Sequence, residues 1–267
     1  MQESWPVRLF SKSFIKQNKY KKIINALGST KGKHILEIGS DNGVFSYLFR
    51  QLGGTWKSAD IDERSVAAMR ELVKTDVYHL ADGQPIPFAD NEFDCVIIVD
   101  IIEHLYDDAG LIQEIYRVLK PGCPLIVNAP NNKENSLLMR FRYLIGITET
   151  DHGHVRPGYT YADLERLLGN HFSLDTYQTH TKFFSKLIDT LMIMAISVLK
   201  KKKKEVTSGR GILVTGSDMK SHKSLFRIYS LIYPLVWMIS SLDHLLFFRS
   251  GYMFIATTHS IKQINNT

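Results

Sequence analysis

The sequence predicts an α/β fold, in which a doubly wound and mostly parallel sheet of seven strands carries an apolar and basic helical insertion. Between residues 34 and 180, apolar β-branched runs alternate with helical patterns, which is typical of a parallel sheet covered by helices on both faces. The alternation then gives way to the segment 183–250, which combines long apolar runs with clustered lysines. The 267 residues suffice for one large domain with an appendage.

The elements of the sheet follow one another along the chain. Strands are expected at 34–38, 55–61, 76–80, 93–100, 124–129, 172–180 and 251–259. Helices are expected between them, at 44–52, 63–73, 107–119 and 161–169. These boundaries predict three regions: an N-terminal helical arm over 1–30, an α/β domain formed by 31–182 with 251–267, and the insertion 183–250.

Composition excludes several protein classes. The content of charged residues is 22% and that of aromatic residues 11%, which argues against a disordered chain. Only Cys95 and Cys123 are present, too few for a disulfide framework or a four-cysteine zinc site, and we expect buried, reduced thiols in a cytosolic protein. The first residues contain no apolar core of a secretory signal, so we expect none.

The turn after the first strand indicates the kind of ligand. Strand 34–38 leads through Ser40-Asp41-Asn42-Gly43 into a helix, and glycines there let the backbone turn tightly and approach a ligand. The spacing is not that of a dinucleotide-binding loop, and Glu37 and Asp41 would repel a pyrophosphate. Carboxylates suit a cationic ligand without phosphate, such as S-adenosylmethionine, so an NAD-linked oxidoreductase is disfavoured.

Further carboxylates stand at the ends of consecutive strands. Asp60 could accept hydrogen bonds from ribose hydroxyls, and Asp82 could accept one from an adenine amino group. Asp100 ends the fourth strand, whereas Asp62 is better explained as a helix N-cap. Together these acids outline one crevice above the carboxyl ends of the strands, where open α/β sheets bind ligands.

At this point the sequence resembles a known family, the class I S-adenosylmethionine-dependent methyltransferases of the broad type 11 group. The resemblance covers roughly 145 residues from Glu37, plus the last strand, with the family's spacing. The segments that carry it are LEIGSDNG, the acid of SADID, ADGQPIPFADNEFDCVIIVDIIEHL, EIYRVLKPGCPLIVNAPN and HVRPGYTYADLERLL. The resemblance implies a Rossmann-like sheet with an antiparallel last strand, S-adenosylmethionine as cofactor, and methyl transfer.

The resemblance also implies roles for individual residues. The positions expected to bind the cofactor are Glu37, Gly39, Ser40, Gly43, Asp60, Ile61, Asp82, Gly83 and Asp100. Asp41 departs from the pattern, because the family usually has a glycine there. An Asp tolerates the left-handed backbone at modest cost, so we expect altered loop geometry rather than lost binding.

Methyl transfer to a hydroxyl requires a group that removes a proton, and a histidine is the usual type. The candidates are His104 and His154, and each has an alternative as a structural histidine. Tyr159 and Tyr161 could line the acceptor pocket, or be ordinary packed tyrosines. His152 and Asp151 add metal-ligand residue types, but nothing in the resemblance requires a metal, so no metal site is expected.

The insertion calls for a separate explanation. Residues 182–250 hold 12 of the 33 Lys/Arg but only 4 of the 27 Asp/Glu, and the apolar runs of the insertion are shorter than a membrane span. A helix lying at an anionic membrane surface on the cytoplasmic side fits best. Packed core helices, a homodimer contact or a solvated linker are alternatives, and nucleic acid is disfavoured.

These features predict a methyltransferase peripheral to the inner face of a membrane. Its acceptor would be a small molecule with lipid character or a lipid-linked one. Oxygen is the atom that we expect to be methylated, and carbon and nitrogen are the alternatives. The alternative is a non-catalytic methyltransferase-like module that scaffolds a membrane complex. The oligomeric state stays open.

Overall fold

The computed structural model describes residues 4–40, 42–81, 83–148, 153–200, 223–246 and 250–262. The strands are β1 (His34–Ile38), β2 (Thr55–Asp60), β3 (Val77–His79), β4 (Cys95–Val99), β5 (Pro124–Pro130), β6 (Phe172–His180) and β7 (Met253–Ser260). The helices before β5 are α1 (Trp5–Phe10), α2 (Phe14–Leu27), α3 (Val44–Arg50), α4 (Glu63–Val73), the 3-10 turn η1 (Ile102–His104) and α5 (Asp108–Val118). Those after it are α6 (Leu137–Leu144), α7 (Tyr161–Leu168), α8 (Phe183–Lys200), α10 (Lys223–Ser241) and the 3-10 turn η3 (Leu242–Leu246).

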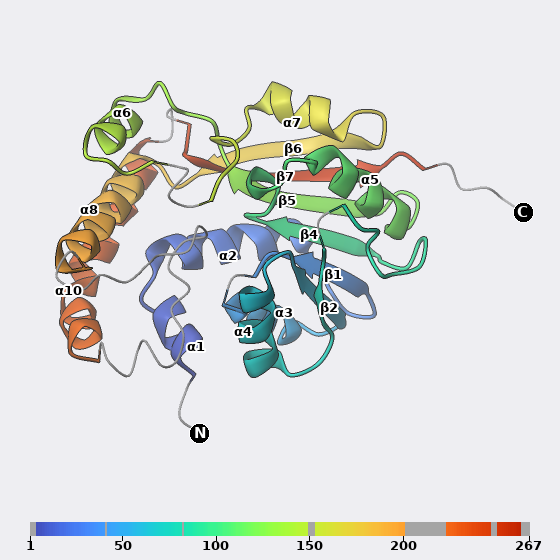
Figure 1. Cartoon of the computed structure of the whole chain (residues 1–267), viewed down its shortest axis with the longest axis horizontal. Coiled ribbons are helices and arrows are strands. Elements are labelled where there is room, and N and C mark those ends of the chain that lie inside the picture. Colours follow the sequence, from blue (N-terminus) through green and yellow to red (C-terminus); the bar gives the residue numbers. More distant parts are fainter. Residues whose placement is uncertain are drawn as a thin grey trace, which may run out of the picture.

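The described strands form one seven-stranded sheet in the order β3-β2-β1-β4-β5-β7-β6 (Figure 1). The first five strands run parallel, while β7 lies between β5 and β6 and is antiparallel to both. The order reverses beside β1, between β1 and β4, which is where open α/β sheets bind ligands. The predicted fold class is confirmed, including the antiparallel last strand.

Both faces of the sheet are buried, which explains why the strands read as unbroken apolar runs. Along β4, Val96 and Ile98 point into the core cluster on the α5 and α7 side. Cys95, Ile97 and Val99 point into the cluster on the α2 and α3 side. Cys95 is a buried thiol as expected, and burial raises its pKa to about 12. Cys123 is only partly buried.

The N-terminal residues form α1 and α2, and α2 packs into the core. Ile23 and Leu27 of α2 pack in the same cluster as the side chains of β1 and α3. In addition, α1 and α2 contact the insertion: Trp5 meets Phe226 edge to face, and the Tyr229 hydroxyl donates to the carbonyl of Lys12 over 2.7 Å. The arm therefore joins the sheet to the insertion.

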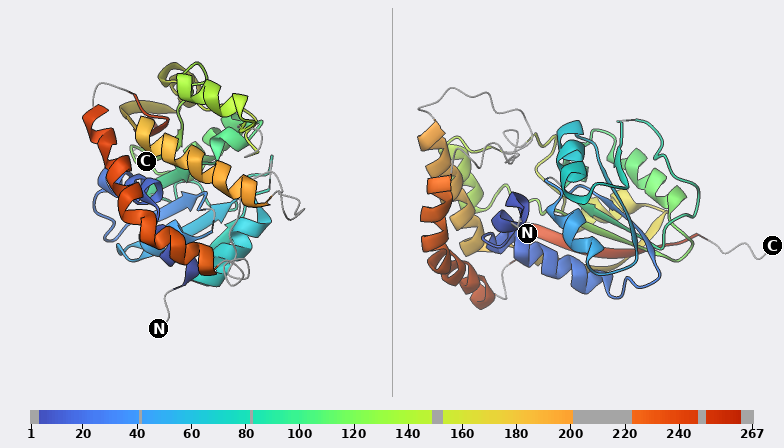
Figure 2. Two further views of the ribbon diagram at one scale, coloured as in Figure 1. Left: turned by 90° about the vertical axis from the view of Figure 1, so that its left-hand side faces the viewer. Right: turned by 90° about the horizontal axis from the view of Figure 1, so that it is seen from below.

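The insertion consists of two packed helices, α8 and α10, at one end of the molecule (Figures 1 and 2). Asp243 in η3 accepts hydrogen bonds from the backbone nitrogens of Lys182 and Phe184, both over 2.8 Å, and thereby caps the start of α8. The run Lys201–Lys204 lies outside the described residues. No helix in the described ranges combines the length and the apolar character needed to cross a membrane.

One helix of this end was not predicted from the sequence. Helix α6 is only eight residues long and starts at Ser136, whose hydroxyl accepts from the backbone nitrogen of Met139. Its Arg142 is almost fully buried and donates to the Thr190 hydroxyl of α8 over 2.9 Å. Such a tertiary contact between distant segments leaves no periodic signal in so short a stretch.

Candidate functional site

The turn between β1 and α3 is shaped by close backbone contacts. Gly39 has φ +93°, and a Cβ there would lie 2.1 Å from the Val99 carbonyl oxygen and 2.3 Å from Cγ1 of Ile101. Gly43 has φ +77°, and a Cβ there would lie 2.8 Å from Cα of Met69. Both glycines are therefore required by neighbouring protein atoms. Their predicted role as an approach for a ligand stays a prediction.

Hydrogen bonds inside the turn hold its shape. The Gly43 nitrogen donates to the Ser40 carbonyl, and the Ser46 nitrogen donates to the Ser40 hydroxyl, each over 3.0 Å. Ser40 thus satisfies a backbone donor in the first turn of α3. Asp41, the residue that departs from the family pattern, lies outside the described residues. The described part of the turn positions the start of α3 at the carboxyl edge of the sheet.

Glu37 is fully buried beneath this turn. Its Oε2 accepts from the Ser46 hydroxyl over 2.7 Å, and its carboxylate is covered by protein atoms. Burial raises its pKa to about 7, although the Ser46 hydroxyl and the charge of Arg50 act in the opposite direction. Glu37 therefore supports the turn from below, and its contribution to cofactor binding stays a prediction.

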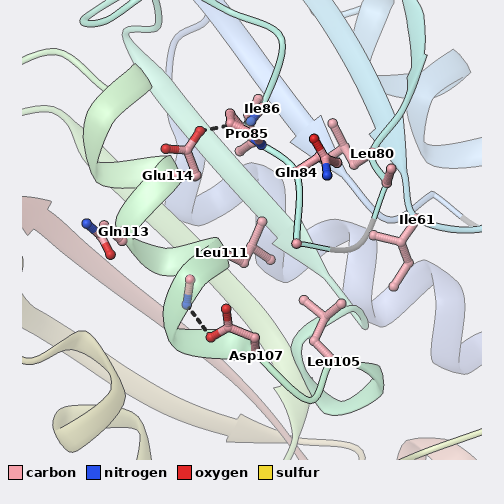
Figure 3. A pocket seen from close by; sticks show the side chains of 13 residues that line it. Ile61, Leu80, Gln84, Pro85, Ile86, Leu105, Asp107, Leu111, Gln113 and Glu114 are labelled. Atoms are coloured by element: carbon pink, nitrogen blue, oxygen red, sulfur yellow. Dashed lines mark hydrogen bonds between the residues drawn. The ribbon is translucent and has the colours of Figure 1, made fainter.

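A pocket of about 280 Å³ lies beside the carboxyl ends of β2 and β3 (Figure 3). Two predicted cofactor positions, Ile61 and Gly83, line it, and apolar side chains of Leu80, Leu105 and Leu111 form much of its wall. Figure 3 shows the side chains of Ile61, Leu105 and Leu111 placed around the space. Such apolar walls suit a flat ring. Asp82, predicted at this position, lies outside the described residues.

Asp60 precedes this pocket at the end of β2. Its side chain is buried, and Oδ1 accepts from the Asp62 nitrogen over 2.9 Å. That bond fixes the carboxylate at the strand end. Asp62 occupies the N-cap position of α4 as expected, but its side chain makes no capping bond and instead accepts from the Ser65 hydroxyl over 3.3 Å.

Asp100 is the centre of a polar network at the switch in strand order. It has φ +51°, a left-handed conformation that Asp adopts at modest cost. Its Oδ1 accepts from Asn128 of β5 over 2.7 Å, and its Oδ2 forms an ion pair with Lys19 of α2. The network continues to His180 at the end of β6, whose Nε2 lies 2.9 Å from Asn128 Oδ1.

The directions of these bonds fix the state of His180. Because Asn128 Oδ1 can only accept, His180 Nε2 carries the proton, and Nδ1 accepts from the Thr181 hydroxyl over 3.0 Å. Burial and the charge of Lys19 lower the pKa of His180 to about 3, so the ring is neutral. The sequence analysis missed Lys19, Asn128 and His180. A polar Asn inside the apolar run PLIVNA was the one available signal.

The two candidate bases lie together. The rings of His104, in η1 after β4, and His154 are edge to face with centroids 4.8 Å apart. His104 Nδ1 lies 3.0 Å from the Gly153 carbonyl oxygen, so the loop that holds His154 also orients His104. Glu103 is buried beside them, and the ligand atoms of Glu103, His104 and His154 all lie within 4.8 Å of one another. Asp151 and His152 are outside the described residues.

Tyr159 is not a pocket residue. It is buried, and its hydroxyl lies 2.9 Å from the Ile102 carbonyl and 2.7 Å from Asp108 Oδ2. Burial and the nearby Asp108 carboxylate raise its pKa. The alternative of a packed structural tyrosine is thus the better description. Tyr161 is half exposed and stacks edge to face against Tyr177.

The raised pKa of Glu37 predicts a pH-dependent stability. Folding favours the protonated carboxyl, so this contribution is complete below pH 4.5 and is lost as pH rises through about 7. Glu37→Gln removes this ionisation. The difference in free energy of unfolding between the variant and wild type should therefore shift in favour of the variant by on the order of 3 kcal/mol from pH 5 to pH 8. Thermal unfolding at both pH values measures this difference. The exposed Glu63→Gln is the control, and an equal effect of Glu37→Gln at both pH values would contradict the prediction.

Comparisons with known proteins agree with this geometry. Residues 36–127 match the family model described as a methyltransferase domain. A Mycolicibacterium smegmatis protein named "Probable S-adenosylmethionine-dependent methyltransferase" is 34% identical over 101 residues, which are 38% of this chain and 39% of that protein. The ubiquinone/menaquinone biosynthesis C-methyltransferase UbiE of Haemophilus ducreyi is 33% identical over 113 residues, covering 39% of this chain and 44% of that one.

The chain thus spans less than half the length of these relatives. A solved structure from Bacillus halodurans covers 92% of this chain and 100% of its own, with a TM-score of 0.57 and 17% identity, and supports the fold alone. The matched region runs from β1 to β5 and contains Gly39, Gly43, Asp60 and Asp100 at the edge that holds the pocket. Residues 36–127 thus form a methyltransferase domain, and the chain is similar to S-adenosylmethionine-dependent methyltransferases.

Proposed function

We propose that the protein transfers the methyl group of S-adenosylmethionine to an acceptor that has lipid character. One observation carries the proposal: the pocket at Ile61 and Gly83, the network at Asp100 and the pair His104 and His154 share the carboxyl edge of the sheet. A crevice with one apolar end and one polar, proton-accepting end suits a nucleoside cofactor and a nucleophilic acceptor.

The residues at this edge fit the cofactor. The carboxylate of Asp60, fixed by its bond to the Asp62 nitrogen, is the candidate acceptor for the ribose hydroxyls. The apolar walls contributed by Ile61 and Leu105 would hold the adenine, next to Gly83. Asp100 would face the methionine end, where its charge suits an ammonium group. When bound, the cofactor supplies a methyl group already activated by a sulfonium.

The task of the protein's own side chains is to position the acceptor and take its proton. For an oxygen acceptor, the bond from oxygen to the methyl carbon forms as the carbon–sulfur bond breaks, and the hydroxyl proton passes to an imidazole. His104 and His154 are the candidates, because η1 comes directly after β4 and the two imidazole rings are in contact. Oxygen is the methylated atom that we propose. The relative from Haemophilus ducreyi is named a C-methyltransferase, which makes carbon the alternative.

The choice of acceptor rests on the exposed apolar side chains of the insertion and of α6. Leu231 is 81% exposed and Trp237 is 52% exposed, so these large side chains meet solvent in the isolated chain. The others on α10, η3 and α6 are Ile232, Leu235, Met238, Leu242, Leu245, Leu137, Phe141, Leu144 and Ile145. Figure 2 shows α6, α8 and α10 side by side at the end of the molecule that bears them. An apolar surface of this kind suits a lipid bilayer.

Basic residues of the N-terminal arm lie against aromatic side chains of α10, on the side of this helix that meets the arm. The Lys12 ammonium lies 5.2 Å from the centre of the Tyr233 ring, and the Arg8 guanidinium lies 5.5 Å from that of Phe226. Positive charge beside an apolar face favours anionic headgroups. We therefore propose attachment to an anionic membrane on its cytoplasmic side, with the acceptor taken from that membrane.

A second candidate is a non-catalytic scaffold built on the same fold. It is favoured by the departure at Asp41 and by the ion pair of Lys19 with Asp100, which already satisfies a carboxylate expected at the methionine end. This candidate predicts membrane binding without methyl transfer, so the experiments below separate the two.

The cofactor assignment predicts that Asp60→Asn weakens S-adenosylmethionine binding. A neutral amide loses a charge-assisted hydrogen bond to the ribose, which corresponds to a roughly 10- to 100-fold weaker Kd. Calorimetric titration of the full chain measures the change. Asp62→Asn removes a neighbouring carboxylate with no expected ribose contact and serves as control. Equal affinities of wild type and Asp60→Asn would contradict the assignment.

The membrane assignment predicts that the apolar face carries vesicle binding. The pair Leu235→Asp and Met238→Asp places two charges in this face, and should reduce flotation with anionic vesicles at least fivefold, because charged groups resist transfer from water. Ile261→Asp, at the far end of β7, is the matched control on an exposed apolar residue. Wild type that fails to float with anionic vesicles would refute the membrane assignment.

The catalytic assignment predicts transfer of a labelled methyl group into a lipid extract. The full chain is incubated with anionic membranes and S-adenosylmethionine carrying a labelled methyl, and the product is analysed by mass spectrometry. A methyl ether identifies an oxygen acceptor, and a methyl on carbon identifies the alternative. Loss of product in His154→Ala, with cofactor binding retained, would assign a role in the transfer step. Absence of product with bound cofactor would favour the scaffold.

A further inference from the structure

Three potential metal ligands converge beside the crevice. Glu103 and His104 lie in η1, directly after β4, and His154 lies in the loop after α6. Each offers one ligand atom, and these atoms lie within 4.8 Å of one another. Ligand atoms around a tetrahedral zinc ion at about 2.1 Å are about 3.4 Å apart, so side-chain rotations that move these atoms by about 1 Å close the set around one ion.

Two hydrogen bonds hold the loop that contains His154 against η1. The Val155 nitrogen donates to the Glu103 carbonyl over 2.9 Å, and His104 Nδ1 lies 3.0 Å from the Gly153 carbonyl oxygen. These two contacts place the residues on both sides of His154 against η1. The three side chains are therefore brought together by the fold itself and do not depend on a bound ion for their approach.

The hydrogen bond of His104 to the Gly153 carbonyl also fixes the tautomer of the ring, and this tautomer can bind a metal. A carbonyl oxygen can only accept, so Nδ1 carries the proton and the lone pair of the neutral ring is at Nε2. An imidazole whose second nitrogen donates to a backbone carbonyl is the usual arrangement around a metal ligand. This bond orients the His104 ring before any ion arrives.

Burial of the carboxylate adds a reason for a cation. Glu103 is 1% exposed, and its Oε2 is buried, as is Nδ1 of His154. A divalent ion held by the three ligand atoms would therefore lie largely out of water, where its attraction to a carboxylate is strong.

We propose that Glu103, His104 and His154 bind one divalent transition-metal ion, with zinc as the best match. Two imidazole nitrogens and one carboxylate oxygen form the ligand set of many catalytic zinc sites, which keep a further position open. Mg²⁺ and Ca²⁺ prefer oxygen ligands and fit this set poorly. The sequence analysis expected no metal, because it considered Asp151 and His152 and did not bring Glu103 and His104 beside His154.

The site has a consequence for the acceptor, which rests on the proposed function. An ion held at η1 would bind an acceptor hydroxyl at its open position and lower its pKa, so that the proton leaves to solvent water before the oxygen takes the methyl group and the carbon–sulfur bond breaks. The two histidines would then serve as ligands, and the acceptor class that completes the site is an ionisable oxygen such as a phenol or an enol. Metal binding itself requires neither the acceptor nor the cofactor.

Titration with Zn²⁺ alone tests the site. The full chain, prepared without a histidine tag and stripped with a chelator, is titrated in a calorimeter, and Co²⁺ absorption reports the ligand field. We expect one saturable ion per chain in wild type. Glu103→Gln and His154→Ala should each weaken binding at least 10-fold, while His34→Ala, which removes an exposed histidine outside the cluster, should leave it unchanged.

The outcomes separate the metal site from the proposed function. No saturable binding to wild type, or equal affinity in wild type and Glu103→Gln, overturns the metal site. Glu103→Gln keeps the shape of the side chain, so the variant is expected to fold. A normal thermal unfolding transition would establish that it does. If zinc does not bind but S-adenosylmethionine does, the methyltransferase proposal stands without the metal site. If zinc binds but S-adenosylmethionine does not, the metal site stands without the methyltransferase proposal.

Discussion

The ion pair between Lys19 and Asp100 is the interaction on which the arrangement of the crevice depends. Lys19 is 8% exposed, and it lies 81 residues from Asp100 in the chain. Lys19 is the buried member of the pair, whereas the Asp100 side chain is 36% exposed, so loss of Asp100 would leave a buried ammonium without this carboxylate. Through Asn128 and His180 the same network reaches β5 and β6, so one set of polar bonds ties the arm to three strand ends.

Much of the fold could be predicted from the sequence, because the information was local. β4 has two buried faces, and its residues Cys95–Val99 are apolar without interruption. The short helix α6 escaped prediction because its stability depends on Arg142, which reaches α8 across the fold. The Asp100 network escaped for the same reason: neither Lys19 in a basic run nor His180 at a strand end has a local feature that indicates its partner.

Only part of the candidate site could be anticipated from the sequence. The family resemblance named Ile61 and Gly83 as cofactor positions, and both line the pocket. It could not tell that the surrounding protein covers Glu37 or that Asp108 and Ile102 hold the Tyr159 hydroxyl. Those facts depend on which side of a strand or loop another element covers. Burial of a single polar side chain is a tertiary property, and an acidic residue at a strand end can serve the ligand or the fold.

Helix α2 contacts both α10, which is proposed to face the membrane, and Asp100, which is proposed to face the methionine end of the cofactor. Its 14 residues extend about 21 Å, with Ile23 and Leu27 packed in the core under the sheet. Near its start, Gln17 donates to the Tyr233 hydroxyl of α10 over 3.0 Å, and little more than half a turn later Lys19 pairs with Asp100. A rigid helix cannot move at one of these points without moving at the other. The position of α10 and the charge environment at the proposed methionine end are therefore mechanically linked, which gives the basic N-terminal arm a structural role beyond its charge.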